Sequence, residues 1–255
     1  MNGRFANYPS LEGRRVLVTG GASGIGAGIV EHFLAQGAHV GFLDLDEASA
    51  AVLLAQQPAD AVVHFEKVDL RDIPALRAAI ADLRGKLGGG FEVLVNNAAR
   101  DDRHSIDEVT PEYWDDRMAT NLRHQFFCAQ AVKDDMIAAG GGSIINMSSN
   151  SFLMAQGGFA AYTSAKSGVI GLTRSLARDL GPHHIRANIV FPGWIITQRQ
   201  LDLWMTPEAE AKRAAGQCIP DRLYEADVAR MVLWLAADDS RLVTAREFIV
   251  DGGWY

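Results

Sequence analysis

The sequence is poor in cysteine and has no apolar run long enough to span a membrane. Only two of its 255 residues are cysteine, Cys128 and Cys218, and they lie far apart. Two distant thiols make neither a disulfide framework nor a closely spaced metal site, so we expect a cytoplasmic protein without bound metal. The first fifteen residues lack the apolar core of a signal peptide. No stretch approaches the ~20 apolar residues that cross a bilayer, so no membrane partner is expected.

Positive charge is also scarce. The chain has 24 Lys and Arg against 31 Asp and Glu, which gives a formal net charge of −7. Nucleic-acid binding requires a basic surface, so nucleic acid is excluded as the main partner. The apolar share of 48% is that of an ordinary globular protein, and the length allows a substantial core.

Short β-branched runs alternate with longer amphipathic stretches along the whole chain. The strand candidates are RRVLVTG, AHVGFLD, AVVHFEKVD, FEVLVNN, GSIINMSS, IRANIVF and REFIVDG. The helix candidates are residues 24–36, 72–87, 111–139, 160–180 and 225–237. This alternation predicts an α/β fold with one domain over residues 1–255, a Rossmann-type doubly wound parallel sheet with helices on both faces.

One insertion, at about residues 193–216, interrupts this alternation. It contains TPEAEAKRAA, in which Thr206 is placed to cap a helix and Pro207 to occupy its first position. A loop with a short helix after a sheet strand is a usual place for an active-site lid, and we expect the segment to act as one.

A glycine-rich turn, TGGASGIG at residues 19–26, follows the first predicted strand and precedes a helix. Such a turn brings backbone N–H groups close to phosphate at a helix N-terminus, although it is also compatible with a purely structural turn. Asp44 ends the second predicted strand, where a dinucleotide fold places an acid on the adenosine ribose; the alternative is a strand-end cap. A carboxylate there repels a 2′-phosphate, and the turn contains no Lys or Arg. Both features favour NAD over NADP.

Tyr162 and Lys166 are four residues apart on a predicted helix and therefore share one face. One explanation is packing, with the tyrosine in the core and the lysine reaching toward water. The other is chemistry, since a nearby ammonium group lowers the pKa of a phenol and makes it a better base at neutral pH.

Several short motifs favour the chemical explanation. In chain order they are TGGASGIG, VDL at Val68–Leu70, NNAA at Asn96–Ala99, MATNL, INMSSNS, YTSAK, PGWIIT and VDGGWY. Together they resemble the classical short-chain dehydrogenase/reductase family, with its TGxxxGxG, NNAG, YxxxK and PGxxxT patterns, although Ala99 replaces the last glycine of NNAG. The resemblance covers nearly the whole chain and implies an NAD-dependent oxidoreductase.

The resemblance also implies roles for individual residues. The catalytic residues would be Asn121, Ser149, Tyr162 and Lys166. The cofactor-binding residues would be Gly20, Ser23, Gly24, Ile25, Gly26, Asp44, Asp69, Leu70, Asn96, Ala98, Tyr162, Lys166, Pro192, Gly193, Ile195 and Thr197. Ser149 matches the family serine that holds the substrate oxygen; Ser148 and Ser151 fit the spacing less well. Asn121 would support a water-linked proton relay to Lys166.

Two segments, NNAARDDRHSIDEVT and PGWIITQRQLDLWMTPEAEAKRAAGQC, resemble those of bacterial sugar dehydrogenases of the D-xylose type in this family. They imply oxidation of an aldose at C1 to an aldonolactone. The predicted substrate residues are Ser149, Asn150, Tyr162, Trp194, Gln198 and Arg199, with Trp204 as a second aromatic face. A further hypothesis is that Arg100, Arg199 or Arg222 binds the anionic group of an acidic or sulfonated sugar.

Two alternative functions remain open at this point. The first is a dehydrogenase of the same family acting on another alcohol, such as a polyol, hydroxyacyl or cyclic alcohol. The second is a non-catalytic module that senses NAD, which would need the glycine turn but not the proton-transfer residues. Resemblance to the family also predicts a homotetramer or homodimer formed through the helices at residues 111–139 and 160–180, with Trp254 and Tyr255 available for a contact at another interface.

Overall fold

Seven parallel strands form a single sheet at the centre of the computed structural model, which describes residues 5–255. Their order across the sheet is β3-β2-β1-β4-β5-β6-β7. The strands are β1 Arg15–Thr19, β2 His39–Asp44, β3 Val63–Lys67, β4 Val93–Asn96, β5 Gly142–Met147, β6 Ile185–Pro192 and β7 Glu247–Val250. The order reverses direction between β1 and β4, and this reversal opens a crevice beyond the carboxyl ends of the strands.

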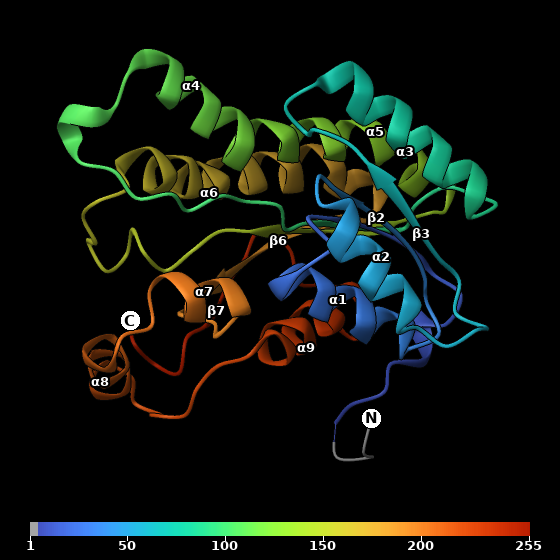
Figure 1. Ribbon diagram of the computed structural model, residues 1–255. Helices are drawn as coiled ribbons and strands as arrows, with labels where there is room; N and C mark the ends of the chain where they lie inside the picture. The colour runs from blue at the N-terminus through green and yellow to red at the C-terminus, as the bar shows by residue number, and fades with distance from the viewer. Residues whose placement is uncertain (1–4) are drawn as a thin grey trace.

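Helices cover both faces of the sheet (Figure 1). One layer contains α1 Gly24–Leu34, α2 Glu47–Ala55 and α9 Glu225–Ala236. The other contains α3 Ile73–Lys86, α4 Pro111–Met118, α5 His124–Ala138 and α6 Ala160–Leu180. This arrangement confirms the predicted single-domain Rossmann-type fold. Within residues 5–255, no helix combines the length and the apolar character that crossing a membrane requires.

The core lies in two layers because successive side chains of a strand point to opposite faces of the sheet. In β1, Val16 and Val18 pack with Ile29 of α1 and Val232 of α9. Leu17, between them, faces the other layer. All three β1 side chains are fully buried. A strand buried on both faces has to be apolar at every position, which explains the continuous run VLV.

The structure differs from the sequence predictions in three helical regions. The helix expected over residues 111–139 is interrupted by a π-helical turn at Ala119–Arg123, which separates α4 from α5. The helix α2 was not predicted, and neither was α7, Gln198–Leu203. The helix predicted after Thr206 is confirmed as α8, Pro207–Gly216, and the Thr206 hydroxyl accepts a hydrogen bond from the Ala209 N–H at 3.2 Å.

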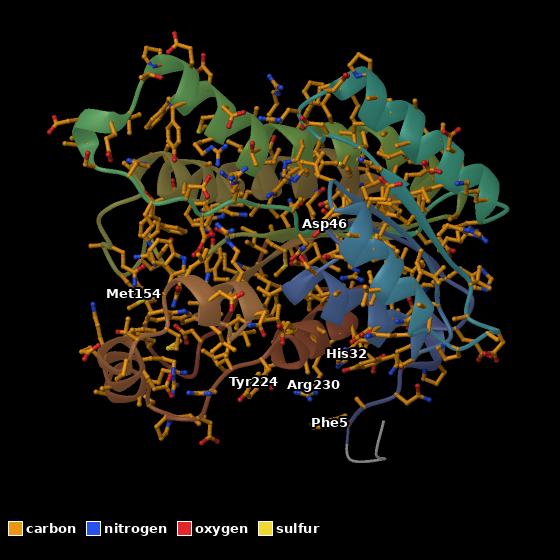
Figure 2. All side chains as sticks on the ribbon, viewed as in Figure 1. Phe5, His32, Asp46, Met154, Tyr224 and Arg230 are labelled. Atoms are coloured by element: carbon orange, nitrogen blue, oxygen red, sulfur yellow. The ribbon has the colours of Figure 1, made fainter. Side chains whose placement is uncertain are left out.

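The first described residues are held against the α1/α9 layer. The Arg230 guanidinium carbon of α9 lies 3.8 Å from the centre of the Phe5 ring, and Figure 2 shows the two side chains together. This contact lies on the outer surface of α9, away from the carboxyl ends of the strands. It therefore belongs to the scaffold and leaves the crevice open.

Candidate active site

A cavity of about 1060 Å³ lies beyond the carboxyl ends of the strands. Its walls come from the turns that follow β1, β2, β3, β4, β5 and β6, from the start of α6, and from residues 193–216. Most residues predicted to bind cofactor or substrate line this cavity, including the turn glycines, Asp44, Ser149, Tyr162 and Lys166. These motifs are spread over almost 180 residues of sequence, and the fold brings them together in one cavity.

The glycine turn can accommodate a phosphate group. Gly20 and Gly24 have φ of +65° and +53°, a backbone region that glycine adopts without strain. The α1 N-cap residue, Ser23, makes no side-chain capping hydrogen bond, so the first N–H groups of α1 are left for an anion. A Cβ atom at Gly26 would lie 1.7 Å from the Gly20 carbonyl oxygen. Only glycine at position 26 therefore allows the first turn of α1 to lie this close to the Gly20 carbonyl oxygen.

Substituting Gly26 by Ala is expected to lower nicotinamide-cofactor affinity at least ~10-fold, because the turn has to open and its N–H groups move. Gly85→Ala in α3 is the matched control, since a Cβ atom there meets nothing within 4 Å. It should leave affinity unchanged and stabilise the fold by about 0.5–1 kcal/mol. Titration calorimetry measures the affinities, and wild-type cofactor affinity in the Gly26 variant would contradict the assigned role of the turn.

Asp44 lies where β2 meets the glycine turn. Its Oδ2 accepts a hydrogen bond from the Ala22 N–H at 2.9 Å, and its Oδ1 accepts from the Leu45 N–H at 2.7 Å. These bonds fix the carboxylate at the cavity wall, with lone pairs left for a ligand hydroxyl. The residues at this end of the cavity therefore fit an adenosine ribose.

The prediction for the asparagine pair after β4 is wrong in register. Asn96 is fully buried and donates to the Gln125 carbonyl oxygen and to Asn146 Oδ1, and it does not line the cavity. Asn97 lines the cavity instead and donates through Nδ2 to the Gly20 carbonyl oxygen at 2.9 Å. The strand alternation puts neighbouring side chains on opposite sides, so a shift of one residue exchanges a core role for a cavity role.

The helix α6 brings Tyr162 and Lys166 into the cavity from one face, as predicted. The Lys166 Nζ donates to the Met147 carbonyl oxygen at 2.9 Å and lies 5.7 Å from the centre of the Tyr162 ring. Ser149 follows β5, and its hydroxyl hydrogen-bonds that of Ser151 at 3.0 Å. The Ser148 hydroxyl donates to the Lys166 carbonyl oxygen at 2.7 Å, which commits it to the scaffold and leaves Ser149 as the better reactive serine.

Burial dominates the electrostatics of this pair. It lowers the pKa of Lys166 to about 7, because the charged form loses hydration, while the Asp101 carboxylate partly opposes the shift. The expected net lowering of the phenol pKa is not found in this arrangement. Burial and the Asp101 charge together raise the pKa of Tyr162, and the hydrogen bond with Ser149 offsets only part of the rise. Desolvation therefore exceeds the effect of the ammonium group.

Asn121 lies in the π-helical turn and does not line the cavity. Its side chain is fully buried, with Oδ1 accepting from the Arg100 N–H at 2.8 Å and Nδ2 donating to the Arg117 carbonyl oxygen at 3.0 Å. The Asn121 side chain therefore holds the loop after β4 in place, and the predicted water-linked relay from this residue to Lys166 stays a prediction.

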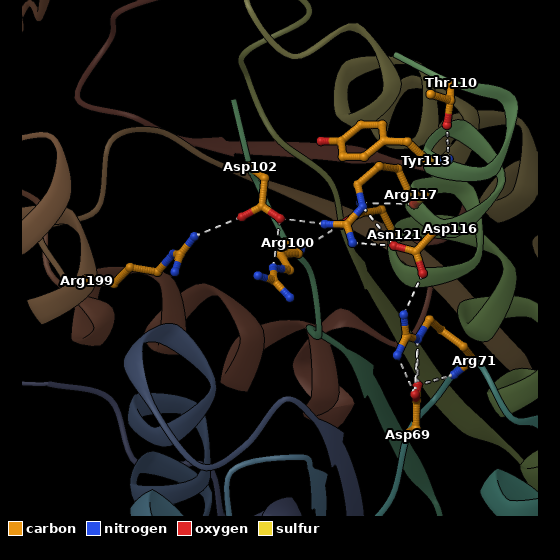
Figure 3. Close-up of polar contacts among 10 residues, drawn as sticks. All are labelled: Asp69, Arg71, Arg100, Asp102, Thr110, Tyr113, Asp116, Arg117, Asn121 and Arg199. Carbon is orange, nitrogen blue, oxygen red and sulfur yellow. Dashed lines mark hydrogen bonds and ion pairs between the residues drawn. The ribbon is translucent and has the colours of Figure 1, made fainter. Parts of the chain in front are cut away.

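A chain of ion pairs that was not predicted from the sequence includes four residues that line the cavity, Asp69, Arg71, Arg117 and Arg199. Figure 3 shows its contacts. It begins at Asp69 after β3, passes through Arg71, Asp116, Arg117 and Asp102, and ends at Arg199 of α7. The Arg117 side chain, at 8% exposure, is the buried centre of the chain. Pairing with Arg71 lowers the pKa of Asp69. The network connects the predicted cofactor end to residues 193–216.

The three arginines named in the anionic-sugar hypothesis all form ion pairs within the protein, and the hypothesis stays a prediction. Arg100 and Arg199 both pair with Asp102, at 2.8 and 3.3 Å. Arg222 pairs with Glu210 at 3.0 Å and does not line the cavity. Each of the three guanidinium groups thus has a carboxylate partner, but Arg100 and Arg199 share Asp102 with Arg117.

The segment at residues 193–216 forms the outer wall of the cavity. Trp194 donates through Nε1 to Gln200 Oε1 at 2.9 Å, and Gln200 in turn donates to Asp101 Oδ2 at 3.2 Å. The Arg103 guanidinium carbon lies 4.6 Å from the centre of the Trp204 ring and 5.1 Å from that of Phe159. Contacts of Asp101 and Arg103 with the segment therefore hold it against the loop after β4.

The predicted substrate residues all line the cavity, and most of their polar side chains already have protein partners. Asn150 donates through Nδ2 to Asp251 Oδ2 at 3.3 Å, and Gln198 donates to Asp202 Oδ1 at 2.7 Å. Trp254, at the end of the chain, also lines the cavity and was not among the predicted substrate residues. The tryptophan is present in VDGGWY, but no sequence pattern predicts that this tail folds toward the cavity.

Comparison with known proteins assigns the family. A family model described as enoyl-(acyl carrier protein) reductase matches residues 20–255. A solved structure of 3-oxoacyl-[acyl-carrier protein] reductase from Brucella melitensis superposes with a TM-score of 0.88 at 32% identity, covering 97% of this chain and 93% of that one. With the cofactor turn and the Tyr162–Lys166 pair in one cavity, the chain belongs to the short-chain dehydrogenase/reductase family, whose dehydrogenases use a nicotinamide cofactor.

Two curated relatives are more similar in sequence. One, "Probable galactose dehydrogenase GalD" of Rhizobium meliloti, is 47% identical over 97% of each chain. The other, D-xylose 1-dehydrogenase of Caulobacter vibrioides, is 46% identical over 98% of each chain. The predicted resemblance to sugar dehydrogenases of this family is confirmed, and the protein is an oxidoreductase that acts on an alcohol group.

Proposed function

We propose that this protein oxidises an aldose at C1 to the aldonolactone, with NAD as the electron acceptor. The observation that carries the proposal is the enclosed constellation of Ser149, Tyr162 and Lys166 in a cavity whose other end has the glycine turn and Asp44. The two sugar dehydrogenases described above, each nearly half identical over almost the full length, support the substrate class.

Each residue has a separate role in the reaction. Tyr162 takes the proton of the C1 hydroxyl, and the Ser149 hydroxyl donates a hydrogen bond to the oxygen as it becomes a carbonyl oxygen. The Lys166 ammonium group, held by the Met147 carbonyl oxygen, stabilises the phenolate once the proton has left, while burial and Asp101 keep the pKa of the Tyr162 phenol raised. When bound, oxidised NAD supplies the acceptor for the C1 hydride and a positive ring charge that also favours the phenolate. The balance is aldose plus NAD giving lactone, NADH and one proton.

NADH formation at 340 nm with D-xylose and D-galactose tests this proposal, with the product trapped as a hydroxamate by hydroxylamine. We expect turnover and one lactone equivalent per NADH. Turnover confined to a hydroxyacyl or cyclic alcohol would contradict the sugar assignment while retaining the dehydrogenase. NAD binding without turnover on any alcohol would indicate a sensor.

The preference for NAD over NADP rests on Asp44. Its carboxylate is fixed at the cavity wall by the Ala22 and Leu45 N–H groups, where it accepts from ribose hydroxyls and repels a 2′-phosphate. Asp44→Ala is expected to lower the ratio of kcat/KM for NAD to that for NADP at least ~100-fold, since about 3 kcal/mol of binding and repulsion is lost. Initial rates with both cofactors measure the ratio.

The matched control for this substitution is Asp82→Ala on the exposed face of α3, which should leave the cofactor ratio unchanged. An Asp44 variant that retains the wild-type ratio would mean that the carboxylate does not select the cofactor. The preference would then have to come from another part of the cavity.

We also infer a homotetramer or homodimer. Exposed apolar side chains on the outer side of the α4–α5 region support it, with Trp114 at 37%, Phe126 at 41% and Ile137 at 37% exposure. Burying such residues against a second copy would remove apolar surface from water. Light scattering should give a multiple of 27.6 kDa, and a particle of 27.6 kDa would contradict the inference.

A further inference from the structure

The last five residues of the chain, 251–255, form a tail that follows β7 and lies near the α7 and α8 end of the molecule (Figure 1). Trp254 of this tail lines the cavity together with Trp194 and Ser149. Tyr255, its neighbour, is 67% exposed and does not line the cavity. The tail thus presents one aromatic side chain to the cavity and the next one to solvent, where the sequence had suggested that both were available for an interface.

The tail is fixed by a buried hub at Asp251, which is 4% exposed. Its carboxylate accepts from Asn150 Nδ2 at 3.3 Å, from the Gly253 N–H at 2.8 Å and from the Tyr255 N–H at 3.1 Å. Asn150 is adjacent to Ser149, so the hub joins the tail to the loop that carries the predicted reactive serine. A carboxylate with three donors is a strong anchor, because its hydrogen bonds are charge-assisted.

The end of α8 holds the tail from the other side. The Cys218 N–H donates to the Gly253 carbonyl oxygen at 3.2 Å, and the Ile219 N–H donates to the Gly252 carbonyl oxygen at 2.9 Å. A Cβ atom at Gly216 would lie 2.3 Å from the Trp254 Nε1, so glycine at the end of α8 leaves the room that the indole occupies. Trp254 is therefore seated against α8 in a single position.

The Trp254 indole is also aligned with a second indole of the cavity wall. The ring centres of Trp194 and Trp254 are 6.2 Å apart and the planes are within 11° of parallel. The hydrogen bond from Trp194 Nε1 to Gln200 Oε1 fixes the orientation of the first ring. Two nearly parallel aromatic faces held by the protein have lost their rotational freedom before any ligand binds, which lowers the entropic cost of binding.

We infer that Trp254 is a substrate-binding residue, an aromatic platform against which the apolar C–H face of the aldose ring packs. The inference rests on the proposed aldose oxidation and assigns a binding residue in the same cavity. An aldopyranose has hydroxyl groups at its rim and a C–H surface on a face of its ring, so a fixed indole suits the face while polar side chains suit the rim. The tail meets the predicted cofactor residues at Gly193, which packs against Asp251, whereas the Trp254 side chain contacts Trp194 and Gly216, so we expect substitution of Trp254 to act on the sugar.

The test compares Trp254→Ala, Trp254→Phe and Tyr255→Ala in the full-length protein, with D-xylose and D-galactose as probes. We expect Trp254→Ala to raise the KM for the preferred aldose at least ~10-fold, while the KM for NAD changes less than twofold. Trp254→Phe should recover most of the affinity, since it restores a flat aromatic face. Tyr255→Ala, the control from the same tail, should leave both KM values within twofold of wild type.

The outcomes separate this inference from the proposed function. Aldose turnover by the wild type with an unchanged aldose KM in Trp254→Ala would overturn the platform alone. So would a parallel rise in the KM for NAD and aldose, since that indicates a disturbed cavity, or a Phe variant no better than the Ala variant. A wild type that oxidises no aldose would overturn the proposed function and the platform together. The rise in melting temperature on adding NAD shows whether the Ala variant is folded.

Discussion

Replacing Tyr162 by Phe should lower kcat for aldose oxidation at least ~1000-fold and leave the affinity for NAD within a few-fold of wild type. The substitution removes only the phenolic oxygen, which is the proposed proton acceptor, and positioned acid–base groups contribute about 10²–10⁴-fold to rate. The ring itself packs near Phe159, with centroids 5.8 Å apart, and Phe preserves this contact. Stopped-flow or steady-state rates give kcat, and calorimetry gives the NAD affinity.

The control for this variant is Tyr224→Phe. Tyr224 precedes α9, is 47% exposed and lies at the lower edge of the molecule in Figure 2, outside the cavity. It should retain wild-type kcat. A Tyr162 variant with more than a tenth of wild-type kcat would show that another group accepts the proton.

Replacing Lys166 by Met should abolish turnover and make the protein more stable. Lys166 is 1% exposed and its charged form is disfavoured by burial, as its lowered pKa of about 7 indicates. Methionine keeps an unbranched apolar side chain of similar length and removes the charge. We expect a loss of kcat of at least ~1000-fold and a gain in the free energy of unfolding of roughly 2–4 kcal/mol at pH 6. The lost hydrogen bond to the Met147 carbonyl oxygen reduces the gain.

The stability gain should depend on pH in a defined direction. The pKa of Lys166 is about 7 in the folded protein and about 10.4 in an unfolded chain, so the unfolded state binds the proton more tightly between these values. The loss of folding stability caused by Lys166 is therefore fully present below pH 7, and it disappears as the pH rises toward 10.4. Chemical denaturation at pH 6 and pH 9 should show a larger advantage for Lys166→Met at pH 6.

Lys67→Met is the control for both measurements. The Lys67 side chain is 57% exposed and pairs with Glu47 at the surface, where its charge stays hydrated. It should change neither kcat nor the difference in stability between the two pH values. Equal stability of Lys166→Met and wild type at pH 6 would contradict a buried, costly ammonium group. The proposed cost is an example of stability given up at a functional site.

Much of the fold could be predicted because the local sequence patterns indicate the same helices and strands that the complete fold contains. The seven strand candidates correspond to β1 to β7, and Thr206 begins α8 through its own side chain. Each prediction relied on neighbouring residues, such as a β-branched run or a cap followed by proline. The break at Ala119–Arg123 was missed because the segment contains neither proline nor glycine, the strongest local signals of a helix break.

The errors at the site concern contacts between distant residues. Asn96 and Asn97 differ only in the side of the sheet they face, which depends on where β4 ends. The compensation of Arg199 by Asp102 joins residues 97 positions apart, so no sequence window contains both. Trp254 reaches the cavity through the bond from Asn150 to Asp251, across 101 positions. Motifs therefore indicated the Ser149, Tyr162 and Lys166 side chains that line the cavity, whereas the contacts of the substrate wall needed three-dimensional structure.

The central claim, oxidation at C1 of an aldose, is tested most directly by comparing each aldose with its own alditol. D-Xylose and xylitol, or D-galactose and galactitol, have the same configuration at their inner carbons, but only the aldose closes into a ring with a C1 hydroxyl whose oxidation gives a lactone. The proposal predicts that kcat/KM with NAD is at least ~100-fold higher for the aldose of each pair. Equal values, or a preference for the alditol, would contradict it and identify a polyol dehydrogenase.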